Sequence, residues 1–235
     1  MTTDLNTTTQ NWILTGLPEE ERERLSARLE PVELALGDVI FRPEEMLQHV
    51  YFPTTAVISL LTDLEDGSGV EVGLVGYDGL AGVSALSESK ESKLATIQHT
   101  GQAFKLRAAT LREEFGRGGV FQRKLLRYIH ALMSQISQSV VCNVRHKVEQ
   151  RMIRWLLMHH DRVGKDDFKM TQEFIAAMLG VRRASVTEVA QQLQEAGMID
   201  YHRGHIRILD RHGMERRVCE CYGVVKAELG RRASQ

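Results

Sequence analysis

The sequence predicts an α+β chain with an N-terminal antiparallel β jelly-roll barrel, a long central helix and a C-terminal winged helix-turn-helix. Three observations lead to this prediction. Short β-branched stretches alternate with turn residues up to residue 106, a long helical apolar period follows a glycine-rich joint at residues 116–119, and two short helical patterns meet at Gly180 before a basic hairpin. A chain of 235 residues is long enough to bury cores in two domains.

The first half of the chain is expected to hold the strand-rich domain, over residues 15–118. Residues 1–14 are polar, rich in threonine and without a period, so we expect them to be disordered. A short helix over 19–29 follows, with acidic residues in its positive first turn. Six apolar, often β-branched stretches then predict strands at 39–41, 50–52, 57–61, 70–75, 94–97 and 103–106. Strands this short and closely spaced are typical of a barrel or jelly roll, which a helix over 108–115 would close.

Residues 119–143 are predicted to form one long helix that pairs with a second copy of the chain. Four apolar residues alternate by four and three, as in a coiled-coil seam: Leu125, Ile129, Leu132 and Ile136. A neighbouring face is expected to pack on the barrel and consists of Leu126, Met133 and Val140. Because a helix with two apolar stripes has two partners to find, we favour a parallel homodimer over a buried helix that contacts only its own chain.

Residues 144–212 contain two short helices joined by a glycine. In the first, Thr171 is placed to cap the N-terminus, and Gly180 is placed to end the helix in a left-handed turn. The second helix, Arg182–Ala196, repeats the apolar spacing on one face and carries polar side chains on the other. This arrangement predicts a helix-turn-helix, whose second helix can reach base edges and phosphates in a major groove.

A two-stranded hairpin is expected to follow the helix pair. Residues 198–202 and 205–209 flank Arg203-Gly204, which predicts a basic wing. A helical hairpin with a solvated basic face is the alternative for the helix pair alone, and the wing and the tandem Arg182-Arg183 favour nucleic-acid binding instead. Residues 213–235 are expected to form a C-terminal helix with its tail.

The charged residues are divided unevenly along the chain, although the formal net charge is only −1. Residues 1–143 carry 13 basic and 19 acidic side chains, whereas residues 144–235 carry 17 basic and 12 acidic ones, with six of the nine histidines. The basic half contains the predicted helix-turn-helix, which suits contact with a phosphate backbone there. There is no apolar run of membrane-spanning length and no signal peptide, so we expect a cytoplasmic protein without a membrane partner.

The three cysteines, Cys142, Cys219 and Cys221, are too few for a disulfide framework in a chain of this length. The Cys-Glu-Cys spacing at residues 219–221 is not that of a common zinc or iron–sulfur motif, so we expect idle or buried thiols and no metal site. We find no nucleophile–base motif, no phosphate-binding glycine loop before a helix and no paired-histidine zinc motif. The chain is therefore not expected to be an enzyme.

The order of these elements, with the run Val-Arg-Arg-Ala-Ser-Val-Thr-Glu at residues 181–188, resembles that of the Crp/Fnr family of bacterial transcription regulators. The resemblance covers about residues 15–210 and is most specific in the helix-turn-helix. It implies that residues 15–118 form a cyclic-nucleotide-binding-like sensor domain. It also implies a homodimer whose paired recognition helices meet two half-sites about one helical turn apart.

The resemblance also implies roles for individual residues. Arg183 matches the arginine that reads guanine through a bidentate fork, and Ser185 matches a hydroxyl that contacts a phosphate. The cyclic-AMP receptor subgroup has a base-reading glutamate where this chain has Ala184, and a second arginine where it has Glu188, so the operator should differ from that subgroup's. The predicted DNA-binding residues are Thr171, Gln172, Arg182, Arg183, Ser185, Thr187, Glu188, Gln192 and Arg203.

The effector site of the family is not matched. Cyclic-AMP binders of the family carry a Gly-Glu pair and an Arg-Ser or Arg-Thr pair, whereas this chain has Val83 near the glutamate position and no such arginine pair downstream. Lys90 or Lys93 would supply charge without arginine's planar fork, so the sequence argues against cyclic-nucleotide binding. The N-terminal cysteine cluster of the iron–sulfur subgroup is missing, and His49 and His99 are expected to be structural or surface residues. We therefore expect no cofactor and leave the effector unknown.

The sequence thus predicts a sequence-specific DNA-binding transcription regulator that reads a palindromic operator as a homodimer through the helix Arg182–Ala196. Its expected partners are double-stranded DNA and a second copy of the chain, with RNA polymerase as a further candidate. The alternative is a ligand-sensing module that acts through protein–protein contacts and not through DNA.

Overall fold

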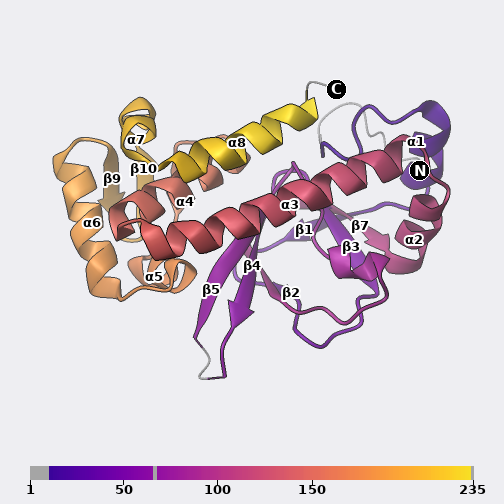
Figure 1. The fold of residues 1–235 in the computed structure, drawn as a ribbon, viewed down its shortest axis with the longest axis horizontal. Helices are drawn as coiled ribbons and strands as arrows, with labels where there is room; N and C mark the ends of the chain where they lie inside the picture. Colours follow the sequence, from indigo (N-terminus) through magenta and orange to yellow (C-terminus); the bar gives the residue numbers. More distant parts are fainter. Residues whose placement is uncertain (1–10, 66–67, 234–235) are drawn as a thin grey trace. The chain divides into compact units, whose positions relative to one another are not determined.

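The structure is a computed structural model that describes residues 11–65 and 68–233 (Figure 1). It has two compact units: Met1–Leu60 with Gly73–Met133, and Leu61–Val72 with Ser134–Gln235. Antiparallel sheets towards the N-terminus and a helix-rich C-terminal half with a helix-turn-helix confirm the predicted fold class. Within residues 11–65 and 68–233, no helix has both the length and the apolar character that a membrane span requires.

Two sheets form the strand-rich N-terminal part of the chain. The strands are β1 (Glu30–Leu34), β2 (Val39–Phe41), β3 (His49–Pro53), β4 (Val57–Asp63), β5 (Gly69–Val75), β6 (Leu94–His99) and β7 (Gly101–Arg107). One sheet has the order β1-β7-β3 and the other β2-β6-β4-β5, and β7 pairs antiparallel with both of its neighbours. All six predicted strands are present. The additional strand β1 was not predicted because its residues, Glu-Pro-Val-Glu-Leu, include a proline and two carboxylates, which are rare in strands.

Four helical segments complete the first unit: α1 (Glu19–Ser26), the short η1 (Val83–Leu86), α2 (Ala108–Gly116) and the first half of α3 (Gly119–Arg145). Their apolar faces meet the sheets in one core, which includes Ile13, Leu25, Phe52, Leu106, Leu111, Phe121, Leu125 and Tyr128. The Glu21 carboxylate accepts hydrogen bonds from the backbone N–H groups of Val120 and Phe121 at 2.9 and 2.7 Å. These bonds satisfy two donors that the first turn of α3 leaves free.

The N-terminal boundary of order differs from the expectation. Residues 1–10 of the expected disordered stretch lie outside the described residues. Residues 11–14 form the start of a turn, with Ile13 and Leu14 buried. The Asn11 side-chain amide donates to the backbone oxygens of Pro53 and Gly79, both at 2.8 Å. A buried amide with two satisfied donors explains why this polar segment is ordered.

Two of the four residues predicted to form the seam of α3 pack within the chain's own core. Leu125 is fully buried in the core of the first unit, and Leu132 packs against that core, so neither is available as an open seam. The residues expected to face the barrel are exposed instead: Leu126 (51%), Met133 (64%) and Val140 (58%). Ile129 and Ile136 are half-buried and lie three residues after Leu126 and Met133. The period of the pattern was correct, but periodicity alone does not say which stripe meets the chain's own core.

The second unit is organised around α4 (Val148–Val163), which most of the other helices contact. The remaining elements are β8 (Asp167–Lys169), α5 (Gln172–Leu179), α6 (Arg183–Glu195), β9 (Ile199–His202), β10 (His205–Ile208), α7 (Arg211–Arg217) and α8 (Glu220–Ala233). Apolar residues from these elements are buried, among them Met152, Leu156, Phe168, Ile175, Val186, Leu193, Ile206 and Met214. β8 adds a third strand to the predicted two-stranded wing, in the order β8-β10-β9.

The C-terminal segment is two helices where one was expected. The chain becomes extended at Val218 (ψ 152°), and α8 begins at Glu220. Neither a proline nor a glycine marks this break, so no local signal predicts it. The break turns Cys219 into the interior, where it is 3% exposed.

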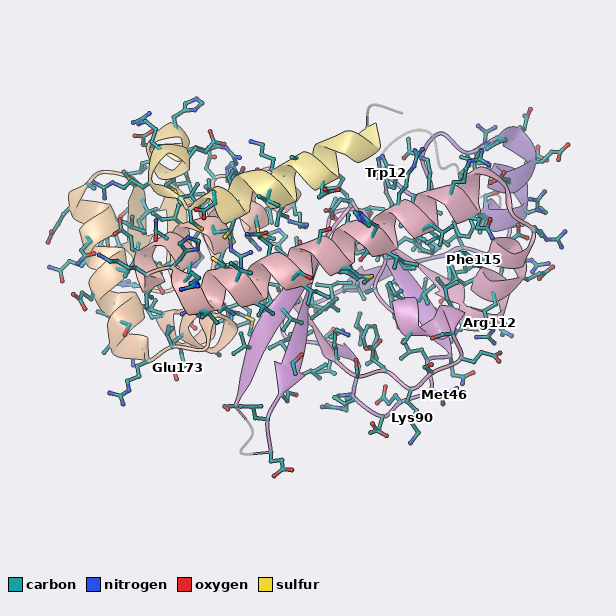
Figure 2. The ribbon with its side chains drawn as sticks, viewed as in Figure 1. Trp12, Met46, Lys90, Arg112, Phe115 and Glu173 are labelled. Atoms are coloured by element: carbon teal, nitrogen blue, oxygen red, sulfur yellow. The ribbon has the colours of Figure 1, made fainter. Side chains whose placement is uncertain are left out.

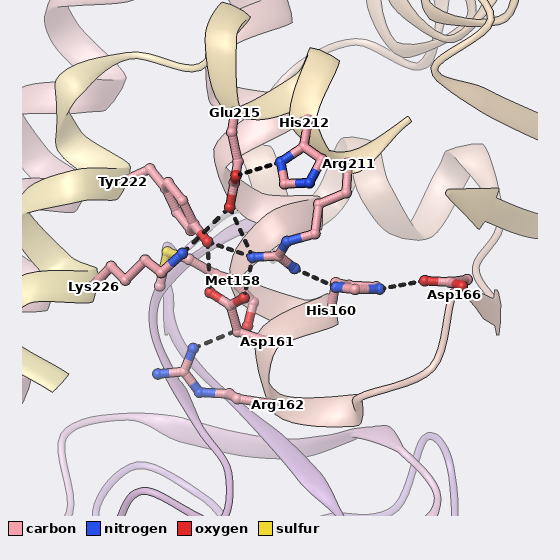
Figure 3. Close-up of polar contacts among 10 residues, drawn as sticks. All are labelled: Met158, His160, Asp161, Arg162, Asp166, Arg211, His212, Glu215, Tyr222 and Lys226. Carbon is pink, nitrogen blue, oxygen red and sulfur yellow. Dashed lines mark hydrogen bonds and ion pairs between the residues drawn. The ribbon is translucent and has the colours of Figure 1, made fainter. Parts of the chain in front are cut away.

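A polar cluster fastens α7 and α8 to α4 (Figure 3). The Arg211 guanidinium donates to Asp161 at 2.5 Å, to Glu215 at 3.1 Å and to the Tyr222 hydroxyl at 2.7 Å. The Tyr222 hydroxyl in turn donates to Asp161 at 2.9 Å. Burial, together with the Asp161 carboxylate, raises the pKa of Tyr222, so the hydroxyl stays protonated and remains a donor. Each member has a partner, which makes the half-buried cluster stabilising.

Candidate nucleic-acid interface

The first helix of the predicted motif, α5, begins and ends as the sequence indicated. The Thr171 hydroxyl accepts a hydrogen bond from the backbone N–H of Phe174 at 3.1 Å, which caps the N-terminus. Gly180 ends the helix in the left-handed conformation, with φ 60° and ψ 45°. A Cβ at this position would lie 2.5 Å from Cγ2 of Val70, so both the backbone angle and the close contact require glycine.

The second helix, α6, presents a polar face because its apolar face is fully used. Val186, Val189, Ala190 and Leu193 are buried. The polar positions lie on the other side, and Arg182, Arg183, Thr187, Glu188 and Gln192 are all exposed, with Ser185 half-buried. Six of the nine predicted DNA-binding residues therefore lie on or next to this one helix face, where a groove could receive it.

A side-chain contact sets the two helices of the motif against each other. The Thr187 hydroxyl lies 2.6 Å from Oε1 of Gln172 and 3.1 Å from the backbone oxygen of Arg183. Thr187 and Gln172 were both predicted as DNA-contacting residues. In this structure they also position α6 on α5, which is a role the sequence did not suggest.

The wing turn is fixed by two residues with positive φ angles. Arg203 has φ 49° and Gly204 has φ 78°, and two consecutive residues with positive φ are what a type I′ hairpin turn needs. The Gly204 oxygen accepts from the N–H of Met170 at 2.7 Å, and a Cβ at Gly204 would lie 3.3 Å from Cγ2 of Thr171. The tip of the wing therefore packs against the N-terminus of α5 and holds the Arg203 side chain beside it.

The motif and the wing enclose a shallow concavity of about 530 Å³. Its lining residues are Thr171, Gln172, Glu173, Arg183, Gln194, Tyr201, Arg203 and Gly204. Four of the predicted residues thus converge on one surface, whereas Glu173, Gln194 and Tyr201 were not predicted. The alternation of β9 could have indicated Tyr201, since a residue two positions after the buried Ile199 lies on the same side of the strand.

Arg183, which lines the concavity, is only weakly paired and is available to bind an anionic partner. The Arg183 side chain is 67% exposed, and its only ion pair among the described residues is with Glu173 at 3.9 Å. Glu173 is itself 79% exposed and lies on the outer face of α5 (Figure 2). A pair this long and this exposed contributes little and is easily exchanged for another anion. Burial raises the pKa of Tyr201, which keeps its hydroxyl protonated as a donor to the Met170 oxygen at 3.0 Å.

In the segment that matches the family's effector site, the two lysines considered as ligand cations have partners within the chain. Lys90, which is labelled in Figure 2, pairs with Glu44 at 3.0 Å, and Lys93 donates to the Ser92 hydroxyl at 3.0 Å. Between them, the buried Glu91 carboxylate accepts from the Ser84 hydroxyl at 2.7 Å and from two backbone N–H groups. The Glu91 carboxylate thus stabilises the segment that contains these two lysines.

The structure corrects the expectation of no cofactor and no metal site. Cys142, His146, Cys219 and Cys221 bring four ligand atoms within 4.8 Å of one another. The expectation considered only the spacing of the last two cysteines. It missed that Cys142 and His146 share a helical face at i, i+4 and that the fold carries α8 back to them. Two segments distant in sequence therefore form one cluster.

The comparisons with known proteins agree with this geometry. A Crp-like helix-turn-helix domain matches residues 150–217, which include α5, α6 and the wing. No curated protein matches the chain. Several solved structures resemble it with low sequence identity, so they show its fold.

Three of these structures are from different bacteria. A protein of Eubacterium rectale described as a Crp/Fnr-family transcriptional regulator is 16% identical, with a TM-score of 0.69 over 88% of this chain and 98% of that one. The transcriptional regulator TTHA1359 from Thermus thermophilus is 21% identical, with a TM-score of 0.64 over 80% and 97%. FixK2 from Bradyrhizobium japonicum is 15% identical, with a TM-score of 0.66 over 81% and 98%.

The first two of these structures are described as transcriptional regulators of the Crp/Fnr family. Residues 150–217 match a Crp-like helix-turn-helix domain, and the chain has the fold of solved Crp/Fnr-family regulators over most of its length.

Proposed function

We propose that the chain is a homodimeric, sequence-specific DNA-binding transcription regulator. In this proposal α6 enters the major groove, the N-terminus of α5 meets the phosphate backbone, and the wing contacts the same duplex. Double-stranded DNA and a second copy of the chain are the proposed partners, and RNA polymerase remains a candidate. The observation that carries the proposal is the exposed polar face of α6, with the open Arg183 guanidinium on it, in a Crp-like helix-turn-helix.

The proposed base reader is Arg183. A guanidinium can donate two parallel hydrogen bonds to O6 and N7 of guanine, and the Arg183 side chain is exposed and weakly paired. Arg203 stands on the wing turn, where a backbone phosphate would lie if α6 occupied the groove. The N-terminus of α5, with Thr171 and Gln172, adds the positive end of a helix dipole to the same surface. The exposed Glu188 could accept a hydrogen bond from a cytosine amino group.

The proposed dimer contact is an exposed apolar stripe on α3, which we name the α3 stripe: Leu126, Ile129, Met133, Ile136 and Val140. These residues are spaced alternately by three and four, which is the a/d pattern of a two-stranded coiled coil. Leu126, Met133 and Val140 are exposed in a single chain and the two isoleucines are half-buried, which leaves apolar surface that a second copy would cover. A two-fold dimer would set paired α6 helices at half-sites roughly 34–36 Å apart, so the operator should be palindromic.

The proposal is tested by selecting bound fragments from random duplex DNA and then measuring affinity over a salt series. Arg183→Ala should lose about 1–3 kcal/mol of discrimination at one base pair of each half-site. Arg203→Ala should weaken binding to all sequences alike and reduce the salt slope by about 1. Arg42→Ala removes the same charge from an exposed loop of the first unit and serves as the matched control, with unchanged binding expected.

Two outcomes would contradict the proposal. If the wild-type chain selects no sequence and binds all duplexes weakly, it acts through another partner, as the protein–protein alternative requires. If Arg183→Ala keeps the preference of the wild type at every position, α6 does not read bases in the proposed way.

A further inference from the structure

A second candidate site lies in the second unit, at the cluster of Cys142, His146, Cys219 and Cys221. The three cysteines are 0–3% exposed, and the His146 side chain is 14% exposed. Neither the DNA-binding surface nor the α3 stripe uses any of these four residues. A buried group of three thiols around one imidazole therefore needs its own explanation.

The backbone places the four residues in two pairs. His146 follows the last turn of α3, and its N–H donates to the Cys142 oxygen at 3.0 Å, which sets both side chains on the same face. Cys219 immediately precedes α8, and Cys221 lies in its first turn. The two pairs are 77 residues apart in sequence and meet at a distance of 3.6 Å between Sγ of Cys142 and Sγ of Cys219.

The separations agree with those around a single tetrahedral ion. Bonds of about 2.3 Å to sulfur and about 2.0 Å to nitrogen, at tetrahedral angles, place two sulfurs roughly 3.8 Å apart and a sulfur and a nitrogen roughly 3.5 Å apart. The observed distances are 3.6 Å for Cys142 and Cys219 and 3.5 Å between Sγ of Cys221 and Nδ1 of His146. The other pairs lie within 4.8 Å and would shorten by at most about 1.3 Å.

The surroundings of the cluster match the outer shell of such a site. Nε2 of His146, the ring nitrogen that does not face the sulfurs, lies 3.4 Å from the Glu220 carboxylate. A carboxylate in this position fixes the ring of a metal-bound histidine and makes it more basic. The Gln138 amide donates to Sγ of Cys221 at 3.1 Å, which is a suitable contact for a thiolate.

A buried cation balances the charge that such a site would carry. Three thiolates around a divalent ion leave one negative charge. Arg154 is 6% exposed, and among the described residues its Nη atoms hydrogen-bond to uncharged groups, the Ser139 hydroxyl at 3.3 Å and the Met158 sulfur at 3.7 Å. Within the same part of the chain, its buried Nε has no hydrogen-bond partner. Ser139 lies three residues before Cys142 on α3, so the guanidinium is held on the same stretch of this helix as the cluster.

We propose that Cys142, His146, Cys219 and Cys221 form a structural Zn²⁺ site that ties the end of α3 to the start of α8. A Cys₃His donor set in tetrahedral geometry selects zinc, and four protein ligands leave no open position for catalysis. The ligand atoms are too close together for more than one ion. Binding would displace the thiol protons, and the partly exposed His146 and Glu220 mark the side from which an ion enters.

The first test is metal content. The full chain, purified under reducing conditions, incubated with Zn²⁺ and desalted, should retain about one zinc per chain by mass spectrometry of the metal. Replacement by Co²⁺ should give the visible absorption of a tetrahedral thiolate site. A chelator that removes the zinc should lower the midpoint of thermal unfolding by roughly 5–15 °C.

The second test uses variants. Cys142→Ser, Cys219→Ser, Cys221→Ser and His146→Gln should each lose stoichiometric zinc, whereas His212→Gln, at a side chain that is 86% exposed, should retain it. Glu220→Gln leaves the four ligands intact and should weaken zinc affinity by roughly ten- to a hundredfold. Glu220 is 76% exposed, so this variant remains informative if a ligand variant does not fold.

The proposal is overturned if the wild-type chain retains no zinc, or if all four ligand variants retain it. A disulfide between Cys142 and Cys219 in the freshly reduced chain, detected as alkylation of only one cysteine, would also overturn it.

Discussion

Two adjacent leucines on α3 belong to different parts of the structure: one to the core of the first unit and the other to the proposed dimer contact. Leu125 is 0% exposed within the first unit, whereas Leu126 is 51% exposed on the α3 stripe. Leu125→Ala should leave a cavity and lower the free energy of unfolding by about 3–5 kcal/mol. The dimer dissociation constant should change little, because this side chain does not reach the stripe.

Leu126→Ala should instead weaken the dimer and lower the stability of the single chain much less than Leu125→Ala does. The change removes three carbons, worth about 2.4 kcal/mol when fully buried, and about half of that surface is still exposed in one chain. Burying the rest in a dimer is worth about 1.2 kcal/mol per chain, or about 2.4 kcal/mol per dimer. The dimer dissociation constant should therefore rise roughly fiftyfold.

The assay is sedimentation equilibrium for association and urea unfolding for stability, on wild type and both variants. At concentrations where both are monomeric, Leu126→Ala should lower the free energy of unfolding by no more than about 1.2 kcal/mol, well below the loss expected for Leu125→Ala. The reasoning is refuted if Leu125→Ala dissociates the dimer and Leu126→Ala does not. The dimer contact would then be the seam predicted from the sequence, which contains Leu125.

Three further predictions concern the second unit. Thr171→Ala removes the cap of α5 and should cost about 1 kcal/mol by urea unfolding, while Thr171→Ser should cost little; equal stabilities of the two variants would contradict the capping role. Gly180→Ala should cost at least about 1 kcal/mol by the same assay, because its φ is 60° and its Cβ would lie 2.5 Å from Val70, and an unchanged stability would show that the turn adapts. Burial raises the pKa of Glu215, but Lys226 and Arg211 lower it by more, so its pKa in the folded chain is below the unfolded value of about 4.3. The Glu215 carboxylate therefore stabilises the fold above about pH 4.3, and this stabilisation is lost as the pH falls through the folded pKa. Glu215→Gln should therefore make the free energy of unfolding less dependent on pH below about 4.3, and an identical acid limb would contradict this.

The helix-turn-helix could be predicted closely because its signals are local. A capping threonine, a left-handed glycine and an apolar period fix α5 and α6 within a residue or two, and each signal concerns a single turn of backbone. The strands followed from β-branched runs for the same reason. Where the local signal was weak, as in β1 with its proline, the element was missed.

The wrong seam on α3 and the missed cysteine–histidine cluster have the same physical cause. Both depend on contacts between segments that are distant in sequence, and local sequence patterns do not report such contacts. The choice between the two stripes of α3 depends on which one the barrel covers, and Leu125 and Leu126 read alike in sequence. The metal-ligand cluster depends on a chain break at Val218 that has no helix-breaking residue. The signal that could have found it was the i, i+4 spacing of Cys142 and His146, considered together with the later Cys-x-Cys pair.

The most direct test of the central claim is the mass of the complex that the full-length chain forms on a selected duplex. By native mass spectrometry, the account predicts two chains on one palindromic duplex, and Leu126→Ala should shift the population towards free DNA at low protein concentration. A complex of one chain per duplex, or no complex with any selected sequence, would contradict it.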